Sequence, residues 1–341
     1  MVSFESDYIC GAHPKVLEAL IKTNMDAQSG YGFDCYTAEA AKKIAAACEL
    51  PDAQVTFLSG GTQTNAIAID ALLRSYEGVV AAATGHVNVH ESGAIEHTGH
   101  KVLTLPSHDG KLTAEDLKQM LLTYYGDETA EHMVRPGMVY ITWPTELGTV
   151  YSKAELTAIA DICHEYSMPL YIDGARLGYG LAGKGVDLTL PELARIADVF
   201  YIGGTKVGAL CGEALVFTKN NQPDHFMAFI KQRGALYAKG RLCGVQFDEL
   251  FTDGLYFEIG RYAIDMAERL KDIFRAKGYA FHPETPTNQQ FIVMPNEKIS
   301  PLREKVRFEI WEKLDEKQTV VRFVTSWSTT QADLDYLESV L

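Results

Sequence analysis

Val199-Phe-Tyr-Ile-Gly-Gly-Thr-Lys206-Val-Gly208 is the stretch that decides the fold of this chain. Its first four residues are apolar and predict a buried strand, and the glycines then form a turn that carries a lysine. A second stretch upstream, Leu170-Tyr-Ile-Asp173-Gly-Ala-Arg176, is also apolar and ends at an aspartate. Because ligands of open α/β sheets bind at the carboxyl ends of the strands, we expect Asp173 and Lys206 to face one site.

A strand-end lysine paired with a strand-end aspartate indicates pyridoxal phosphate. Lys206 would form a Schiff base with this cofactor, and Asp173 would keep the pyridine nitrogen protonated, so that the ring accepts electrons. Arg176 can reach back toward a carboxylate or the cofactor ring. The structural alternative is a surface lysine and a helix-capping aspartate, but the run before Asp173 is too apolar to be exposed. A pyridoxal-phosphate site formed by Lys206 and Asp173 predicts that the substrate is a small-molecule amino acid.

Strand-like and helix-like segments alternate along the first part of the chain, which predicts a mostly parallel central sheet flanked by helices. We expect this large α/β domain to span residues 1–245, with an N-terminal segment that reaches the active site. We expect a smaller C-terminal α+β domain over residues 246–341. The expected strands are 55–58, 79–84, 101–105, 137–142, 169–173, 198–202, 213–217, 290–294 and 319–325, and the expected C-terminal helices are 255–277, 301–314 and 331–340.

Composition excludes several classes of partner. The net charge is -14 and no block of Lys and Arg occurs, so nucleic acid and anionic membranes are not expected partners. No apolar stretch approaches the roughly 20 residues that span a bilayer. Six scattered cysteines without a C-x-x-C pair, and no signal-peptide pattern at the start, indicate reduced thiols in a cytoplasmic protein.

Ser59-Gly60-Gly61-Thr62 follows a predicted strand and precedes a predicted helix. Glycines let the backbone approach a phosphate at a helix N-terminus, and the hydroxyls of Thr62 and Thr205 can bind the same anion. Without further support this stretch is an ordinary strand-to-helix turn. It is not a P-loop, because no Lys-Ser/Thr follows the glycines.

Histidines gather at residues 86–100, with Glu91 among them. His86 and His90 would share one face of a helix, which permits a metal site and hence a metal hydrolase. The cluster lacks H-E-x-x-H, and His97 and His100 are separated from the first pair by Gly93. We therefore expect no metal, and we predict that the His86 ring stacks on the pyridine face.

Two other patterns have competing interpretations. Gly178-Tyr-Gly-Leu-Ala-Gly183 matches the dinucleotide fingerprint, which keeps a nicotinamide oxidoreductase as an alternative from another class. It does not directly follow a strand, however, so we treat the match as a coincidence. Arg322 lies inside an apolar strand, where it would either bind an α-carboxylate or point outward to solvent.

With these residues in view, the chain resembles the threonine aldolase family of fold-type-I pyridoxal-phosphate enzymes. The resemblance extends from Ser6 to Arg322 and is most specific at five motifs. They are Asp173-Gly-Ala-Arg-Leu177, Gly61-Thr-Gln-x-Asn65, His86 with Glu91, Lys206, and the loop Lys239-Gly-Arg241-Leu-Cys-Gly244.

The resemblance implies a role for each matching residue. Lys206, His86 and Glu91 would be catalytic, with His86 or a water held by His86 or Glu91 as the base. The cofactor would be held by Gly60, Gly61, Thr62, His86, Asp173, Arg176, Thr205, Lys206 and Arg241. The substrate would be bound by Ser6, Tyr31, Arg176 and Arg322. Tyr31 and Arg241 would reach a neighbouring subunit's site, which implies a homodimer at least and, by likeness, a homotetramer built as a dimer of dimers.

The implied reaction is cleavage of L-threonine, L-allo-threonine or related β-hydroxy-α-amino acids to glycine and an aldehyde. β-Elimination, racemisation and transamination remain alternatives, because the same residues serve them. The loop Trp143-Pro-Thr-Glu146-Leu-Gly148 carries no histidine, whereas some family members have one there. A non-catalytic cofactor-binding protein is a further alternative.

Overall fold

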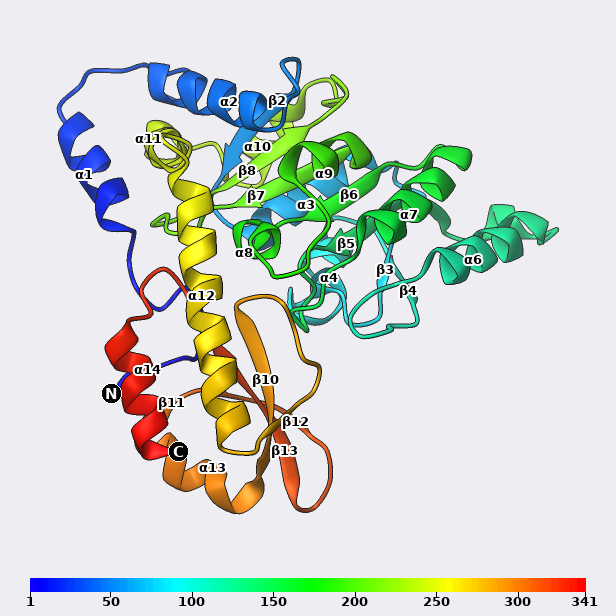
Figure 1. Cartoon of the computed structure of the whole chain (residues 1–341). Helices are drawn as coiled ribbons and strands as arrows, with labels where there is room; N and C mark the ends of the chain where they lie inside the picture. The colour runs from blue at the N-terminus through cyan, green and yellow to red at the C-terminus, as the bar shows by residue number, and fades with distance from the viewer.

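The computed structural model describes residues 1–341 and consists of a large α/β part and a smaller C-terminal part (Figure 1). A seven-stranded sheet forms the large part, in the order β2-β8-β7-β6-β5-β3-β4. Strands β3 to β7 run parallel where they pair, and β8 is antiparallel to both of its neighbours. The expected mostly parallel sheet is therefore confirmed. The strands of this sheet are β2 (Gln54–Leu58), β3 (Glu77–Ala82), β4 (Val102–Leu105), β5 (Arg135–Thr142), β6 (Leu170–Asp173), β7 (Val199–Gly203) and β8 (Glu213–Phe217).

Helices cover both faces of this sheet because its strands are apolar on both sides. Along β3, Val80 and Ala82 pack into a core cluster of 42 residues, whereas Val79 and Ala81 pack into a second cluster of 20. A capping box formed by Ser152 and Glu155 begins α7. The helices of the large part are α1 (Pro14–Thr23), α2 (Cys35–Ala47), α3 (Gly61–Leu72), α4 (His86–Val89), α5 (Ala94–His97), α6 (Ala114–Gly126), η1 (Ala130–His132), α7 (Lys153–Glu165), α8 (Leu177–Leu181), α9 (Leu190–Ile196), α10 (Phe226–Gln232) and α11 (Arg241–Leu250).

The C-terminal part has its own sheet, in the order β12-β13-β10-β9, and its own core cluster of 14 residues. Its helices are α12 (Leu255–Ala276), α13 (Asn296–Arg303) and α14 (Gln331–Val340), and its strands are β9 (Ala280–Phe281), β10 (Gln289–Pro295), β11 (Val306–Arg307), β12 (Glu309–Lys313) and β13 (Gln318–Val324).

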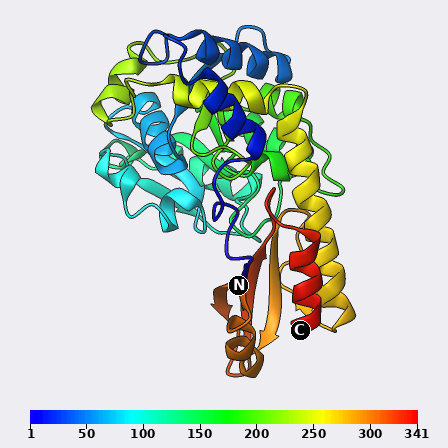
Figure 2. The same ribbon diagram turned by 90° about the vertical axis from the view of Figure 1, so that its left-hand side faces the viewer.

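Two elements connect the parts. Helix α12 runs from one to the other, with Ile259 in the largest core cluster and Phe274 in the C-terminal one (Figure 1). The N-terminal strand β1 (Val2–Ser3) pairs with β11, so the N-terminus lies beside the C-terminal part (Figure 2). We propose a domain division near residue 245, with α12 as the shared element and residues 2–4 packed on the smaller domain.

The expected helix over residues 301–314 is wrong. The structure has α13 earlier in the chain, and then β11 and β12. Val306, Phe308 and Ile310 alternate with charged residues, which is the period of a strand, and β12 pairs with β13. The gain from this pairing outweighs the helix propensity of the neighbouring Glu and Lys residues.

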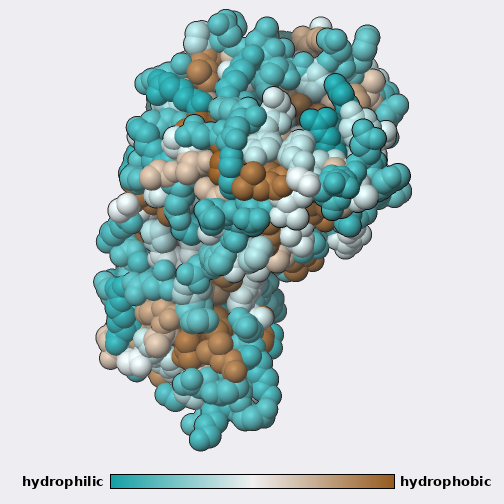
Figure 3. Space-filling view, turned by 90° about the vertical axis from the view of Figure 1, so that its right-hand side faces the viewer, coloured by the Kyte–Doolittle hydropathy of each residue, from teal (hydrophilic) through white to brown (hydrophobic).

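No helix combines the length and the apolar character that crossing a membrane requires. Figure 3 shows hydrophilic side chains over most of one face, with apolar groups gathered in small areas.

Candidate active site

Asp173 ends β6 and is buried. Its Oδ2 accepts hydrogen bonds from Asn65 Nδ2 at 3.0 Å and from the Tyr140 hydroxyl at 2.6 Å, and its Oδ1 accepts one from the Ala175 amide at 3.0 Å. These three donors fix both carboxylate oxygens and balance the cost of burying a charge. The aspartate is thus held at the strand end as a defined acceptor.

Lys206 follows the next strand, β7, in a tight turn. A Cβ on Gly203 would lie 2.1 Å from the Ala175 carbonyl oxygen, so the backbones after β6 and β7 touch. The Lys206 carbonyl oxygen accepts a hydrogen bond from the Tyr179 hydroxyl at 2.5 Å. Both Asp173 and Lys206 line one cavity, as their strand-end positions predict.

That cavity, the inner cavity, has a volume of about 110 Å³. It is lined by Gly61, Thr62, His86, Thr142, Pro144, Thr145, Glu146, Asp173, Ala175, Arg176, Tyr201 and Lys206. Residues from several strand ends and from one helix N-terminus therefore meet there, and six of the predicted site residues are among them.

His86 begins α4 and is oriented by Glu91, which lies in the loop after that helix. His86 Nδ1 lies 2.8 Å from Glu91 Oε1, and the same oxygen accepts a hydrogen bond from Asn65 Nδ2 at 2.7 Å. Burial alone would lower the pKa of His86, but the bond to Glu91 and the nearby carboxylates raise it above its ordinary value. Asn65 thereby connects the histidine to Asp173.

Helix α3 begins at Gly61, and its N-cap residue Gly60 provides no side-chain hydrogen bond. The first amides of a twelve-residue helix are thus left for another acceptor, which is the arrangement that binds a phosphate. Thr62 lies at this end and lines the inner cavity. Thr205 does not line it; its hydroxyl accepts a hydrogen bond from the Gly212 amide at 3.0 Å.

The N-terminal segment supplies the buried residues Ser6 and Asp7. Asp7 binds Arg176 with both oxygens, at 2.7 Å from Nε and 3.0 Å from Nη2. Burial raises the pKa of Asp7, but the charges of Arg176 and Lys206 hold it below its ordinary value. The Oγ of Ser6 is buried and has no partner. The guanidinium of Arg176 is therefore already paired with the Asp7 carboxylate. The unpaired Ser6 hydroxyl belongs to the residue before Asp7.

Arg322 lies in β13 and is buried, so its outward-facing alternative is wrong. One Nη donates to Gln289 Oε1 at 2.8 Å, the other to Glu309, and Nε has no partner. Burial and the charge of Arg176 lower the pKa of Arg322. The positive charges of the two guanidinium groups therefore repel each other.

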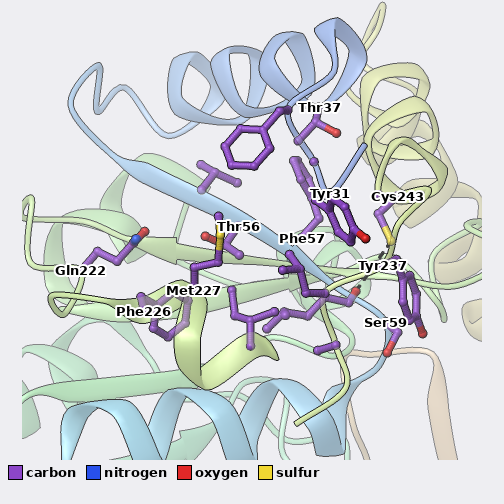
Figure 4. Close-up of a pocket in the computed structure, with 18 residues that line it drawn as sticks. Tyr31, Thr37, Thr56, Phe57, Ser59, Gln222, Phe226, Met227, Tyr237 and Cys243 are labelled. Atoms are coloured by element: carbon purple, nitrogen blue, oxygen red, sulfur yellow. Dashed lines mark hydrogen bonds between the residues drawn. The ribbon is translucent and has the colours of Figure 1, made fainter. Parts of the chain in front are cut away.

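Tyr31 and Arg241 do not line the inner cavity of their own chain. Tyr31 lines a separate cavity of about 170 Å³ beside β2 (Figure 4). Arg241 begins α11 and donates to the carbonyls of Thr23 and Asp26. Their loops pack together, since the Tyr31 amide donates to the Ala238 carbonyl.

Sequence reasoning missed the tyrosines that surround Asp173. Tyr140, Tyr171 and Tyr201 lie within β5, β6 and β7 and are all buried. A buried tyrosine hydroxyl requires a hydrogen-bond partner. The occurrence of a tyrosine in each of three adjacent apolar strands could therefore have indicated a buried polar group near them.

Glu146 and Glu213 were missed as buried carboxyl groups. Glu146 lines the inner cavity, and Glu213 accepts a hydrogen bond from the Gly204 amide at 3.0 Å. Burial raises the pKa of Glu213 to about 8, against the charge of Lys206. Glu146 follows the apolar strand β5, and Glu213 begins the apolar strand β8. Nothing in the neighbouring sequence showed that either carboxyl group would be buried.

The two competing motifs have structural explanations. Gly178 and Gly180 lie in α8, where a Cβ would meet Tyr256 at 3.0 Å and Trp143 at 2.7 Å. The absence of a side chain at these glycines allows α8 to pack closely against Tyr256 and Trp143. This packing leaves no room for a pyrophosphate. No group of three or more His, Cys, Asp or Glu side chains is placed to hold a metal ion.

Comparison with known proteins agrees with this geometry. The family model described as beta-eliminating lyase matches residues 3–293. The low specificity L-threonine aldolase of Pseudomonas sp. is 33% identical, over 96% of this chain and 94% of its own length. The structure of a threonine aldolase from Leishmania major superposes with a TM-score of 0.95 at 42% identity, covering 100% of this chain and 98% of the other.

A more distant structure shows the fold alone. The histidinol-phosphate aminotransferase from Clostridium acetobutylicum has a TM-score of 0.75 at 15% identity, covering 100% of this chain and 98% of the other. The expected fold-type-I architecture is confirmed by these neighbours.

Proposed function

The chain belongs to the beta-eliminating lyase family, and from this premise we propose that it is a pyridoxal-phosphate-dependent carbon–carbon lyase. It cleaves L-threonine, L-allo-threonine or related β-hydroxy-α-amino acids to glycine and an aldehyde. The observation that carries the proposal is the meeting of Asp173, Lys206 and His86 in one cavity at the strand ends. The likeness over nearly the whole length to threonine aldolases supports this choice of reaction.

The residues of the inner cavity fit pyridoxal phosphate. Asp173 is a fixed buried acceptor for the pyridine nitrogen, and the uncapped N-terminus of α3 at Gly61 suits the phosphate. Lys206 provides the amine that attaches the cofactor, and the ring of His86 provides a face for stacking. When bound, the cofactor supplies an electron sink for the substrate's α-carbon.

Arg176, Arg322 and Ser6 bind the substrate's α-carboxylate in this proposal. The two guanidinium groups provide bidentate donors, and the unpaired Ser6 Oγ provides one more. Asp7 and Glu309 are the ion-pair partners of these guanidiniums before the substrate arrives. Binding then exchanges one carboxylate for another, so each guanidinium keeps an anionic partner.

Glu91 fixes His86 through one oxygen that also accepts from Asn65. Glu91 does not line the inner cavity, so we assign it to positioning the histidine. A histidine fixed in this way keeps one orientation toward the cofactor ring and the substrate.

We propose that the active unit is a homodimer at least, and a dimer of dimers in full. Tyr31 is 46% exposed, and its loop packs against the loop that leads to Arg241. Neither residue lines the cavity that holds Lys206 of its own chain. We also place the protein in the cytoplasm, where its six free cysteines stay reduced.

Mixing two inactive variants tests the shared site. Lys206→Ala and Arg241→Ala chains, denatured and refolded together, form mixed dimers in which one site has both native residues. We expect aldehyde release to return in the mixture. Activity that stays absent, while sedimentation shows dimers, would contradict a site shared between subunits.

The proposed reaction is tested by measuring aldehyde release from L-threonine and L-allo-threonine with cofactor-loaded protein. We expect release that disappears in Lys206→Ala, while Lys277→Ala, a change at an exposed lysine after α12, serves as the matched control. Loss of a substrate amine and a carbonyl product without glycine would instead indicate elimination or transamination.

A further inference from the structure

Glu146 lines two cavities. The inner cavity holds Asp173 and Lys206, and an outer cavity of about 690 Å³ lies between the loop after β5 and strand β12. Glu146 is the one residue that lines both cavities. The apolar part of the outer lining consists of Val89, Leu147, Phe308, Ile310 and Trp311.

The Glu146 carboxylate is held by one oxygen and unpaired at the other. Its Oε1 accepts hydrogen bonds from the His86 amide at 2.9 Å and from Thr142 Oγ1 at 2.6 Å. Its Oε2 is buried and has no partner. A buried carboxylate oxygen without a donor is costly, and a ligand that brings a donor removes this cost.

The surroundings of Glu146 suit a group that takes up a proton. Burial raises the pKa of Glu146 above its ordinary value, and the charge of Asp173 adds to this, whereas the Thr142 hydroxyl and the charge of His86 oppose it. A carboxylate with a raised pKa is a stronger base than a free one. The titratable groups of the outer lining are Glu5, His90, Arg303, Glu309 and Glu312.

We propose that Glu146 is the catalytic base that accepts the proton of the substrate's β-hydroxyl group. This inference rests on the proposed function and deepens it. The α-carbon must lie on the side of Asp173 and Lys206, and the β-substituent must extend toward the outer cavity. The bond that breaks would then lie beside Glu146, the residue common to both linings.

The step balances without a further reactant. Glu146 takes the hydroxyl proton, and the electron pair of that O–H bond forms the aldehyde's C=O bond. The Cα–Cβ bond breaks, and its electron pair stays with the α-carbon until that carbon takes a proton from solvent to give glycine, which balances the proton that Glu146 gives up. Glu146 then releases its proton to solvent through the outer cavity.

Other carboxylates are less suited to this task. Asp173 has both oxygens occupied by Asn65, Tyr140 and the Ala175 amide. Glu91 has an unpaired buried oxygen, but it lines neither cavity. Some family members have a histidine in the loop after β5. In this chain Glu146 would supply the base from that loop.

Glu146→Gln tests the assignment, because glutamine keeps the shape and can accept the same two hydrogen bonds. We expect kcat/KM for aldehyde release to fall by about 10²- to 10⁴-fold. Glycine has no β-hydroxyl, so its dissociation constant, measured by calorimetry on cofactor-loaded protein, should stay close to the wild-type value. Glu338→Gln, the same change at an exposed position of α14, is the matched control.

Each result decides between the possibilities. Cleavage that persists in Glu146→Gln at close to the wild-type rate overturns the assignment and leaves the proposed function intact. Loss of glycine binding together with cleavage also overturns it, because Glu146 would then serve the whole site. A wild-type protein that binds glycine but releases no aldehyde from any β-hydroxy amino acid overturns the proposed function itself.

Discussion

The two sides of the active site are built differently. On the cofactor side, Asp173 is held by donors on the sheet and on α3, all within the large part of the chain. On the substrate side, Arg176 is held by Asp7 from the N-terminal segment, and Arg322 is held by Glu309 from β12. One side is held by hydrogen-bond donors, and the other by carboxylates that, in our proposal, the substrate replaces.

This difference shows how one site serves two needs. The cofactor needs a fixed set of groups, because its electronic state depends on where the charge of Asp173 lies. The substrate must enter and its product must leave, so we propose that its binding groups exchange partners. The exchange partners come from the chain terminus and the smaller domain, outside the central sheet.

Among the changes that compare the two sides, the largest expected effect comes from Asp173→Asn on the cofactor side. Asparagine keeps an acceptor oxygen but loses the charge, so we expect kcat/KM to fall by about 10²- to 10³-fold. Steady-state kinetics of aldehyde release measures this, and Asp161→Asn, an exposed change in α7, is the control. Activity close to that of the wild type would show that the charge is not needed.

Arg322→Lys tests the substrate side. A lysine cannot donate two parallel hydrogen bonds to a carboxylate, so we expect KM to rise by about 10- to 100-fold with a smaller change in kcat. Steady-state kinetics of aldehyde release measures both constants. Arg307→Lys, at an exposed position of β11, should leave them unchanged. An unaltered KM in Arg322→Lys would remove this residue from the substrate site.

Glu213 gives a pH test of the buried groups near Lys206. The folded protein keeps this carboxyl protonated up to a pKa of about 8, whereas the unfolded chain releases the proton near its ordinary value. Its contribution to stability is therefore complete below the ordinary pKa and is lost as the pH rises through about 8. We expect the melting temperature to fall as the pH rises across this window, and Glu213→Gln to flatten this dependence. Equal slopes in the two proteins would contradict the prediction.

The smallest expected effect is that of Glu309→Gln. This change removes the carboxylate that competes for Arg322, and partly exposed ion pairs contribute at most about 1 kcal/mol. We therefore expect KM to fall by about two- to fivefold, with Glu316→Gln as an exposed control. A raised KM would show that Glu309 orients Arg322 for the substrate instead of competing with it.

The sequence predicted the positions of Asp173, Lys206 and Gly61 in the fold, because these residues lie in continuous motifs. Asp173 ends an apolar strand, Lys206 follows one, and Gly61 begins a helix, so each position follows from local pattern. Asp7 and Glu146 could not be assigned in this way. Their partners, the Arg176 guanidinium and the His86 amide, lie far away in sequence.

The wrong helix at residues 301–314 has a similar cause. Helix propensity is a local property, whereas the pairing of β12 with β13 depends on the position of another strand. Tyr140, Tyr171 and Tyr201 were likewise visible in the sequence, but their common position around Asp173 depends on the register of three strands.

The sequence by itself determined the alternating sheet, the strand ends that carry Asp173 and Lys206, and the helix N-terminus at Gly61, because these depend on neighbouring residues. The tertiary structure alone decided which carboxylate holds each arginine, and it placed Glu146 in the linings of two cavities. The physical reason is that burial and hydrogen bonding between distant segments depend on how strands, loops and domains pack, and no local pattern encodes that packing.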